Sequence, residues 1–157
     1  RHRRQQLCRV RRTEPSAPAG WGARRSGCCG TGRNAQPGGR TRGGARTTPL
    51  VSPSLGARGF INGITEFAPG VAIPFHSHNC EESVMLLEGH AFLDINGEVH
   101  ELKPFDTTFL PPNVSHRFRN QSATEPMKIF WTYASVHATR TLTESGQTSP
   151  ISAEHNK

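Results

Sequence analysis

The chain has 157 residues, enough to form one domain around a single hydrophobic core. Its net charge of +7 is unevenly divided, because residues 1–50 hold twelve arginines and one glutamate (+11), whereas residues 51–157 hold seven basic and eleven acidic residues (−4). The composition therefore argues against a folded basic domain that binds nucleic acid, and no run approaches the roughly 18 apolar residues of a membrane span.

The N-terminal segment, residues 1–46, is rich in arginine and glycine and poor in apolar residues. Such a segment cannot bury enough apolar surface to offset the entropy of ordering, so we expect it to be disordered. Its arginines could contact nucleic acid by charge alone, but a solvated tail is the simpler interpretation. Because the chain starts with Arg1 and not Met, a wrongly extended reading frame or a fragment edge is a third interpretation.

The four cysteines do not form a disulfide framework. Cys8, Cys28 and Cys29 lie in the N-terminal segment, and the adjacent pair lacks the C-x-x-C spacing of zinc sites. Cys80 has no partner in the expected domain. We therefore expect a reducing, cytoplasmic location, with Cys80 either a small buried side chain or a reactive thiol near a site.

From Thr47 onward, short runs of Val, Ile, Phe and Thr alternate with Gly, Pro and Asn. This pattern predicts strands over residues 59–68, 72–77, 83–88, 90–95, 98–102, 106–110, 115–120 and 127–134. Strands of this length and spacing favour an all-β sandwich or barrel, which we place at residues 47–140. Asn96 and Gly97 separate two of the runs and predict a tight hairpin, since both residues can adopt positive φ. Residues 141–157 are polar, and we expect a short helix or extended arm that ends in a tail.

The stretch FHSHNCEE, residues 75–82, concentrates potential metal ligands. On a strand, residues two apart face the same side at roughly 6.6 Å, so His76 and His78 should point together. A turn through residues 79–81 could bring Glu82 back beside them, and His116 could join from a neighbouring strand of a closed sheet. Three imidazoles and a carboxylate suit a divalent transition metal (Fe, Mn, Ni, Co or Zn) and leave one or two coordination positions open for chemistry.

Two motifs around these residues resemble those of the cupin family. The stretch GVAIPFHSHNCEESVMLLEG matches the first motif at Gly70, His76, His78, Glu82 and Gly89. The stretch FDTTFLPPNVSHRFRN matches the second motif at Pro111, His116 and Asn120. Two glycines of the second motif are replaced. Asn113 can adopt the left-handed conformation, whereas Phe105 suggests a different local turn.

The resemblance covers residues 59–134 and implies a cupin jelly roll, also called a double-stranded β-helix barrel. It implies a metal inside the barrel, held by His76, His78, Glu82 and His116, and often a homodimer. The function that it implies is a small metalloenzyme with dioxygenase-, lyase- or isomerase-type chemistry on a small organic molecule. A cupin that binds or senses a small molecule without converting it is the alternative.

Several side chains near the motifs need an interpretation. Aromatic residues on the strands are expected to form the core or a substrate pocket, the pocket residues being Phe75, Phe92, Phe118 and Tyr133. Glu81 is expected in solvent, and His90, His100 and His137 at the surface or an interface. Arg117 and Arg119 should lie on the opposite face from His116, either ion-paired or gripping an anionic substrate. No residue can be assigned as a catalytic acid or base.

Overall fold

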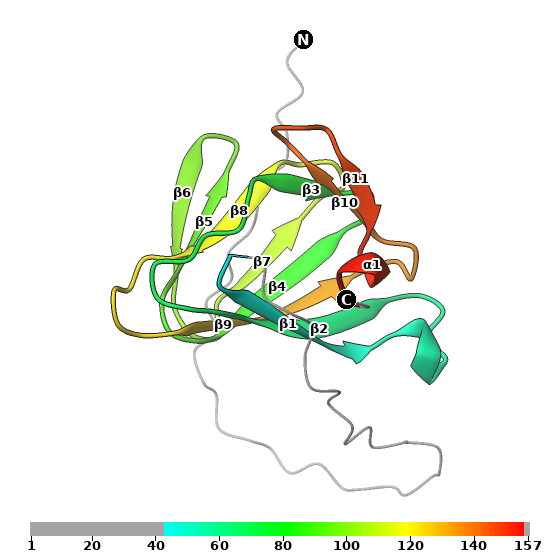
Figure 1. Ribbon diagram of the computed structural model, residues 1–157, viewed down its shortest axis with the longest axis horizontal. Coiled ribbons are helices and arrows are strands. Elements are labelled where there is room, and N and C mark those ends of the chain that lie inside the picture. Colours follow the sequence, from blue (N-terminus) through cyan, green and yellow to red (C-terminus); the bar gives the residue numbers. More distant parts are fainter. Residues whose placement is uncertain (1–42, 156–157) are drawn as a thin grey trace, which may run out of the picture.

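The computed structural model describes residues 43–155, which form two antiparallel β-sheets packed face to face (Figure 1). Sheet A has the strand order β1 (Ala45–Val51), β2 (Ile61–Phe67), β9 (Met127–Tyr133), β4 (Glu82–Glu88) and β7 (Thr107–Leu110). Sheet B has the order β11 (Thr148–Pro150), β10 (Thr139–Leu142), β3 (His76–His78), β8 (His116–Asn120), β5 (Ala91–Ile95) and β6 (Glu98–Leu102). Two short helices, η1 (Pro53–Leu55) and α1 (Ser152–His155), complete the elements. The predicted all-β jelly roll is confirmed.

The core lies between the sheets, because alternate residues of each strand point inward. Strand β9 shows this alternation along its whole length, with Met127, Ile129, Trp131 and Tyr133 buried. The one polar atom of the Trp131 ring is satisfied, since its Nε1–H donates to Thr65 Oγ1 at 3.0 Å. This packing fills the barrel interior below the level of the histidine cluster described in the next subsection.

Each of the eight predicted strands has a counterpart among β2 to β9. Strand β3 is shorter than expected, because Ala72 makes only an isolated bridge to Arg119 and pairing resumes at His76. The hairpin at residues 96 and 97 is confirmed, with φ of 52° at Asn96 and 80° at Gly97.

Three strands were not predicted, and they lie at or near the two ends of the expected barrel domain. Strand β1 begins at Ala45, inside the segment expected to be disordered, and β10 and β11 pair where an arm or tail was expected. Their sequences, ARTTPLV, TRTL and TSP, lack a hydrophobic alternation, and the strands are held mainly by backbone pairing. Strands β1 and β11 lie at sheet edges, whereas β10 lies between β11 and β3. The expectations for residues 1–42 lie outside the described residues.

Asn120, the last residue of the second motif, has a structural task. Its side-chain Nδ2 donates to the carbonyl oxygens of Glu125, Ala68 and Phe67, at 2.8, 3.2 and 3.4 Å. Its Oδ1 accepts the backbone N–H of Ser122 at 3.0 Å. The buried amide thereby ties the loop between β8 and β9 to the end of β2.

Phe105 occupies a backbone conformation that normally favours glycine. Its φ is +73°, its N–H donates to Leu86 O at 2.7 Å, and its side chain leaves the residue 62% exposed. Asn113 also adopts positive φ, 63°, as expected of this residue type. The different turn suggested for Phe105 is therefore not needed: the residue itself takes the left-handed conformation, without burial to offset the steric cost.

Phe105→Gly should raise the free energy of unfolding by about 1 kcal/mol. Glycine takes a φ of +73° without the Cβ clash, and little packing is lost with an exposed phenyl group. Phe105→Ala is the matched control, because alanine removes the phenyl group but keeps the Cβ. Urea unfolding of the three proteins measures the effect, and equal stability of the glycine and alanine variants would contradict the account.

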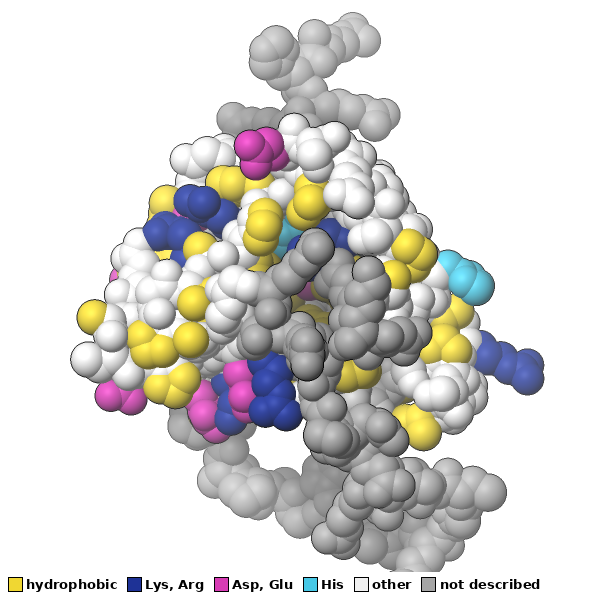
Figure 2. All heavy atoms as spheres, in the orientation of Figure 1, with side chains coloured by type: hydrophobic (Ala, Val, Ile, Leu, Met, Phe, Trp, Pro, Cys, Tyr) yellow, Lys and Arg dark blue, Asp and Glu magenta, His cyan; other side chains and the backbone are white. Residues whose placement is uncertain are grey.

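Charged side chains on the outside of the barrel form small mixed clusters. Lys128 contacts Glu88 at 3.1 Å and Glu66 at 3.6 Å on the outer side of sheet A. On the face drawn in Figure 2, basic side chains likewise lie beside acidic ones. No helix in the described part of the chain has the length and hydropathy that a membrane span requires.

Candidate metal centre

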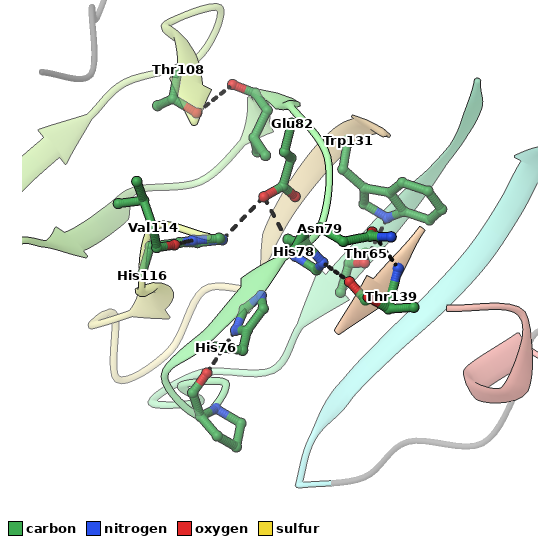
Figure 3. A network of polar contacts seen from close by, with 12 residues as sticks. Thr65, His76, His78, Asn79, Glu82, Thr108, Val114, His116, Trp131 and Thr139 are labelled. Atoms are coloured by element: carbon green, nitrogen blue, oxygen red, sulfur yellow. Dashed lines mark hydrogen bonds and ion pairs between the residues drawn. The ribbon is translucent and has the colours of Figure 1, made fainter. Parts of the chain in front are cut away.

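Four polar side chains converge inside one end of the barrel (Figure 3). His76, His78 and His116 each offer a ring nitrogen, and these nitrogen atoms lie within 4.8 Å of one another. Glu82 faces them, with its Oε2 3.0 Å from His116 Nε2 and 3.6 Å from His78 Nε2. All four residues are buried, with exposed fractions between 1% and 4%. The predicted ligand set is thus brought together as a single cluster.

The two sheets supply different parts of the cluster. Sheet B supplies the imidazoles: His76 and His78 are two apart on β3, and His116 on β8 lies directly opposite His76. Glu82 begins β4 of sheet A, so the turn at residues 79–81 carries the chain from one sheet to the other. The short His-to-Glu spacing therefore places a carboxylate across the barrel from three imidazoles.

Backbone carbonyl groups fix the orientation of all three imidazole rings. The Nδ1 atoms of His76, His78 and His116 lie 2.8, 2.9 and 2.9 Å from the carbonyl oxygens of Pro74, Thr139 and Val114. A carbonyl oxygen only accepts, so each Nδ1 carries the hydrogen and donates it. In the neutral ring this leaves the lone pair on Nε2, the atom that points toward the centre of the cluster. Metal-binding histidines are oriented in the same way.

The inward atoms make no hydrogen bond while each imidazole carries its hydrogen on Nδ1. His78 Nε2, His116 Nε2 and Glu82 Oε2 are all buried, and without a proton on Nε2 the 3.0 Å contact between His116 and Glu82 joins two acceptors. Their mutual approach places nitrogen lone pairs beside a carboxylate oxygen, an arrangement that repels unless a cation lies between them. Either a shared proton or a metal ion supplies that cation.

Burial and mutual charge set the protonation of the cluster. Burial lowers the pKa of His76 to about 3, with repulsion from His116 and His78 adding to the effect. Burial also lowers the pKa of His78. For Glu82, burial alone would raise the pKa, but the contact with His116 and the charges of the imidazoles outweigh it and lower the pKa to about 2. Two imidazoles are thus neutral and the carboxylate is ionised at neutral pH.

His116 is the member of the cluster that most readily holds a proton. Burial would lower its pKa, but the interaction with the Glu82 carboxylate outweighs burial and raises the pKa above 6.5. A proton on His116 and a metal ion at the centre would occupy the same Nε2 lone pair. A metal would therefore have to displace this proton.

The donor set fits a transition metal. Three imidazole nitrogens and one carboxylate oxygen are typical of sites for Fe, Mn, Ni, Co or Zn, whereas Mg and Ca prefer all-oxygen sites. The tautomers and the unpaired buried atoms agree with that assignment. The cluster can hold a divalent metal without rearrangement of the imidazole hydrogen bonds.

Two of the four predicted pocket residues adjoin the cluster. The Tyr133 ring centroid lies 4.4 Å from that of His78, and the Phe118 ring meets His116 edge-on at 6.1 Å. Both side chains point inward, and Phe118 lies on the same side of β8 as His116. Their role in binding a substrate stays a prediction.

The prediction that Phe75 and Phe92 line the pocket is corrected, because both side chains point away from the cluster. Phe75 precedes the inward His76 and is 37% exposed, and Phe92 lies opposite Arg119 on the outer side of sheet B. Arg117 lies over the Phe75 ring at 4.4 Å, and Arg119 lies 5.4 Å from the Phe92 ring centroid. Strand parity from His76, which was not applied, sends Phe75 away from the imidazoles. The side of Phe92 follows from the pairing of β5 with β8, which sets Phe92 opposite Arg119.

The two arginines are ion-paired, as one of the two interpretations expected. Arg117 Nε lies 2.6 Å and Arg119 Nε 2.8 Å from Asp94 Oδ2. The arginines hold the pKa of Asp94 below its usual range, against the opposing effect of burial. This cluster of two arginines, one carboxylate and two aromatic rings therefore stabilises the outer face of sheet B.

The remaining predicted residues lie outside the cluster. Glu81 is exposed, as are His90 and His137, while His100 is half-buried beside Glu98. Cys80 is half-buried and packs against the core. Burial, together with the charge of Glu82, raises the pKa of the Cys80 thiol, which favours the packing interpretation over a reactive thiolate.

Sequence reasoning missed the contribution of β10 to the site. The Thr139 carbonyl fixes His78, and Arg140 lies directly opposite His78 in the strand pairing. Neither residue stands out in the polar sequence TRTL, and only the strand pairing shows that they adjoin the cluster.

The part of the chain that holds the cluster is similar to a known protein family. A family model described as "Cupin domain" matches residues 63–133. The chain is 34% identical over 92 residues to "Polyketide synthase CurC" of Streptomyces cyaneus, a match that covers 58% of this chain and 60% of that protein. It is 30% identical over 95 residues to "Protein SchB" of Streptomyces halstedii, covering 60% of this chain and 69% of that protein. The match therefore spans less than two thirds of the length of the first relative.

Solved structures share the same architecture. A cupin 2 domain-containing protein from Halorhodospira halophila is 27% identical with a TM-score of 0.55, and the match covers 60% of this chain and 67% of that one. The polyketide cyclase RemF from Streptomyces resistomycificus is 19% identical with a TM-score of 0.57, covering 69% and 71% of the two chains. At that identity the second match concerns the fold alone.

Proposed function

The chain belongs to the cupin superfamily, and we propose that it is a metalloenzyme that acts on a small, oxygen-rich organic molecule. In this proposal His76, His78, Glu82 and His116 hold a divalent transition metal. The observation that carries it is the set of buried inward atoms, Nε2 of His78 and His116 and Oε2 of Glu82: a proton on His116 can satisfy its 3.0 Å contact with Glu82 but still leaves His78 Nε2 unpaired. Buried polar atoms are rarely left unpaired without a functional reason.

The bound metal would supply a Lewis acid for a carbonyl or enolate oxygen and, if redox-active, a means to activate O₂. The chain's own residues prepare the site for it. The carbonyl groups of Pro74, Thr139 and Val114 hold the imidazoles in one tautomer, and Glu82 contributes one negative charge. The buried rings of Phe118 and Tyr133 lie against the imidazoles of His116 and His78 and give the site an apolar wall.

The substrate class follows from the relatives and is part of the proposal. The name of the Streptomyces cyaneus relative refers to a polyketide synthase. Polyketides contain 1,3-dicarbonyl units, whose enolates carry oxygen atoms that bind well to a divalent metal. We therefore expect an enolisable or phenolic substrate, converted by lyase-type or dioxygenase-type chemistry.

The second candidate function is binding or sensing without conversion. It is favoured by the deep burial of the four cluster residues, each at most 4% exposed. Such a protein would be stabilised by its ligand but would release it unchanged. The homodimer implied by the resemblance and the cytoplasmic location stay predictions in either case.

Metal analysis and a product search test the proposal together. The purified protein should contain about one divalent metal ion per chain by mass spectrometry. It should consume acetylacetone or salicylate, with or without O₂ uptake, and His116→Gln should abolish the conversion. A protein that holds no metal and stays inert after loading with Fe(II) or Mn(II) would contradict the proposal. Thermal stabilisation by these compounds without any product would support the binding alternative.

Metal affinity should fall as the pH drops through the raised pKa of His116. Below that pKa the ring is protonated at the Nε2 that the metal needs, so one proton must leave per metal bound. His76, with a pKa of about 3, should not compete over this range. Competition with a chelator at pH 8, 7 and 6 should show the affinity falling, by up to about tenfold per pH unit once His116 is protonated. An affinity that does not change between pH 8 and pH 6 would contradict this assignment.

A further inference from the structure

We infer that Asn79 is a positioning residue of the metal centre, because its side chain holds the backbone segment that supplies the hydrogen-bond acceptor of His78. The inference rests on the proposed function, since it concerns how one proposed metal ligand is kept in the form that binds metal. It starts from the Asn79 amide, the Thr139 backbone and the His78 ring, which form one connected set of contacts (Figure 3).

His78 differs from the other two imidazoles in the origin of its acceptor. The Nδ1–H groups of His76 and His116 donate to carbonyl oxygens only two positions earlier in the chain. The Nδ1–H of His78 donates to the carbonyl oxygen of Thr139, 61 positions away, at 2.9 Å. The orientation of His78 therefore depends on where β10 lies, whereas the other two rings are oriented by their own segments.

Thr139 lies just beyond the ladder that joins β10 to β3. The pairing of these strands ends with Arg140 opposite His78. On the other side of β10, Thr139 lies opposite Pro150, which has no N–H to donate. Two side chains from the end of β3 contact the Thr139 backbone: His78 donates to its carbonyl oxygen, and Asn79 Oδ1 accepts its N–H at 2.8 Å.

The Asn79 amide makes a second contact with the same segment. Its Nδ2 donates to the carbonyl oxygen of His137 at 3.2 Å. A backbone N–H only donates and a carbonyl oxygen only accepts, so the two contacts together fix which way the amide points. The exposed Asn79 side chain thus clamps residues 137–139 beside the ring of His78, the residue that precedes it.

The clamp matters because His78 has a competing tautomer. That tautomer carries its hydrogen on Nε2, which lies 3.6 Å from Glu82 Oε2, and a small movement would let it donate to this carboxylate. A hydrogen on Nε2 occupies the lone pair that a metal ion needs. By holding the Thr139 carbonyl in place, Asn79 favours the tautomer in which this lone pair is free.

NMR of the metal-free protein, with its histidines labelled with nitrogen-15, tests the inference at pH 8, because the nitrogen shifts of a neutral imidazole distinguish its tautomers. Asn79→Ala removes both clamp contacts, whereas Asn79→Asp keeps an oxygen that can accept the Thr139 N–H. Asn62→Ala is the matched control, because Asn62 Oδ1 accepts the backbone N–H of Val51 at 3.0 Å on the opposite sheet. A His78→Gln sample identifies the His78 signals, and chelator competition measures the zinc affinity of each protein.

In the wild-type protein His78 should be mainly the Nδ1–H tautomer. Asn79→Ala should shift its tautomer ratio about fivefold toward Nε2–H, as expected for the loss of one ordinary hydrogen bond, and weaken zinc binding about tenfold. The signals of His76 should not change in this variant. Asn79→Asp should lie closer to wild type than Asn79→Ala, and Asn62→Ala should match wild type.

Three results would overturn the inference: an unchanged His78 ratio in Asn79→Ala, an equal shift in Asn62→Ala, or a zinc affinity that stays at the wild-type value despite the shift. A wild-type protein that binds no zinc would instead refute the metal centre itself. The tautomer ratio of the metal-free protein would still decide whether Asn79 positions the His78 ring, so the two failures can be told apart.

Discussion

Replacing His116 with glutamine should lower the affinity of the protein for a divalent metal by at least about a hundredfold. Changes to residues that merely orient a ligand typically cost 10–100-fold, and His116 is a proposed ligand itself. Its Nε2 is buried, points into the cluster and lies 3.0 Å from Glu82 Oε2. Glutamine is used because alanine would leave a cavity at a residue only 1% exposed.

Mass spectrometry of the metal content and chelator competition measure this effect. His76→Gln should behave like His116→Gln, because both residues belong to the same cluster. His90→Gln is the matched control, since His90 is exposed and its ring pairs with Glu101 at 2.6 Å, outside the cluster. Circular dichroism confirms that each variant is folded. Equal metal affinity in the His116 and His90 variants would refute the assignment of the ligands.

Gly89→Ala should destabilise the fold by about 3 kcal/mol or more, a large share of the 5–15 kcal/mol that is typical of a small domain. Two costs add at this position. The φ of +83° disfavours any side chain, and a Cβ would lie 2.5 Å from Pro126 O and 3.0 Å from Met127 Cα. Both contacts are with backbone atoms, which cannot move aside as a flexible side chain can.

Gly97→Ala separates the two costs. Gly97 has nearly the same φ, +80°, but a Cβ there would meet nothing within 4 Å. We expect this variant to lose only about 1–2 kcal/mol, measured by urea unfolding beside Gly89→Ala. If the two variants lose the same stability, the close approach of Gly89 to β9 does not matter, and the account of this motif position is wrong.

Some features of the site could be predicted from the sequence, whereas the reason for the motif glycine Gly89 could not. Strands such as β2, β4, β8 and β9 show an alternation of buried and less buried residues, and the spacing of His76, His78, Glu82 and His116 matches the family motifs. Both features are local or recur at fixed spacing, so they can be recognised without coordinates. The reason for Gly89, in contrast, is its approach to Pro126, a residue 37 positions away, which only the folded chain shows.

The parts that were missed depend on tertiary pairing. Strands β1, β10 and β11 lack a hydrophobic alternation and are held mainly by backbone hydrogen bonds, which carry no sequence signal. Arg140 could not be linked to His78 without the register of β10. Phe75 is a different case, because strict application of strand parity to His76 would have placed it outside the barrel. Phe92, in contrast, needed the register of β5 against β8, which sets it opposite Arg119.

The central claim is that four named side chains bind one divalent transition metal. An anomalous difference map from a crystal of the zinc-loaded protein tests it most directly. We predict one peak inside the barrel, roughly 2.0–2.2 Å from Nε2 of His76, His78 and His116 and from a carboxylate oxygen of Glu82. A map of zinc-loaded crystals with no peak among these residues, or with Glu82 hydrogen-bonded to a protonated His116 in place of the metal, would contradict the claim.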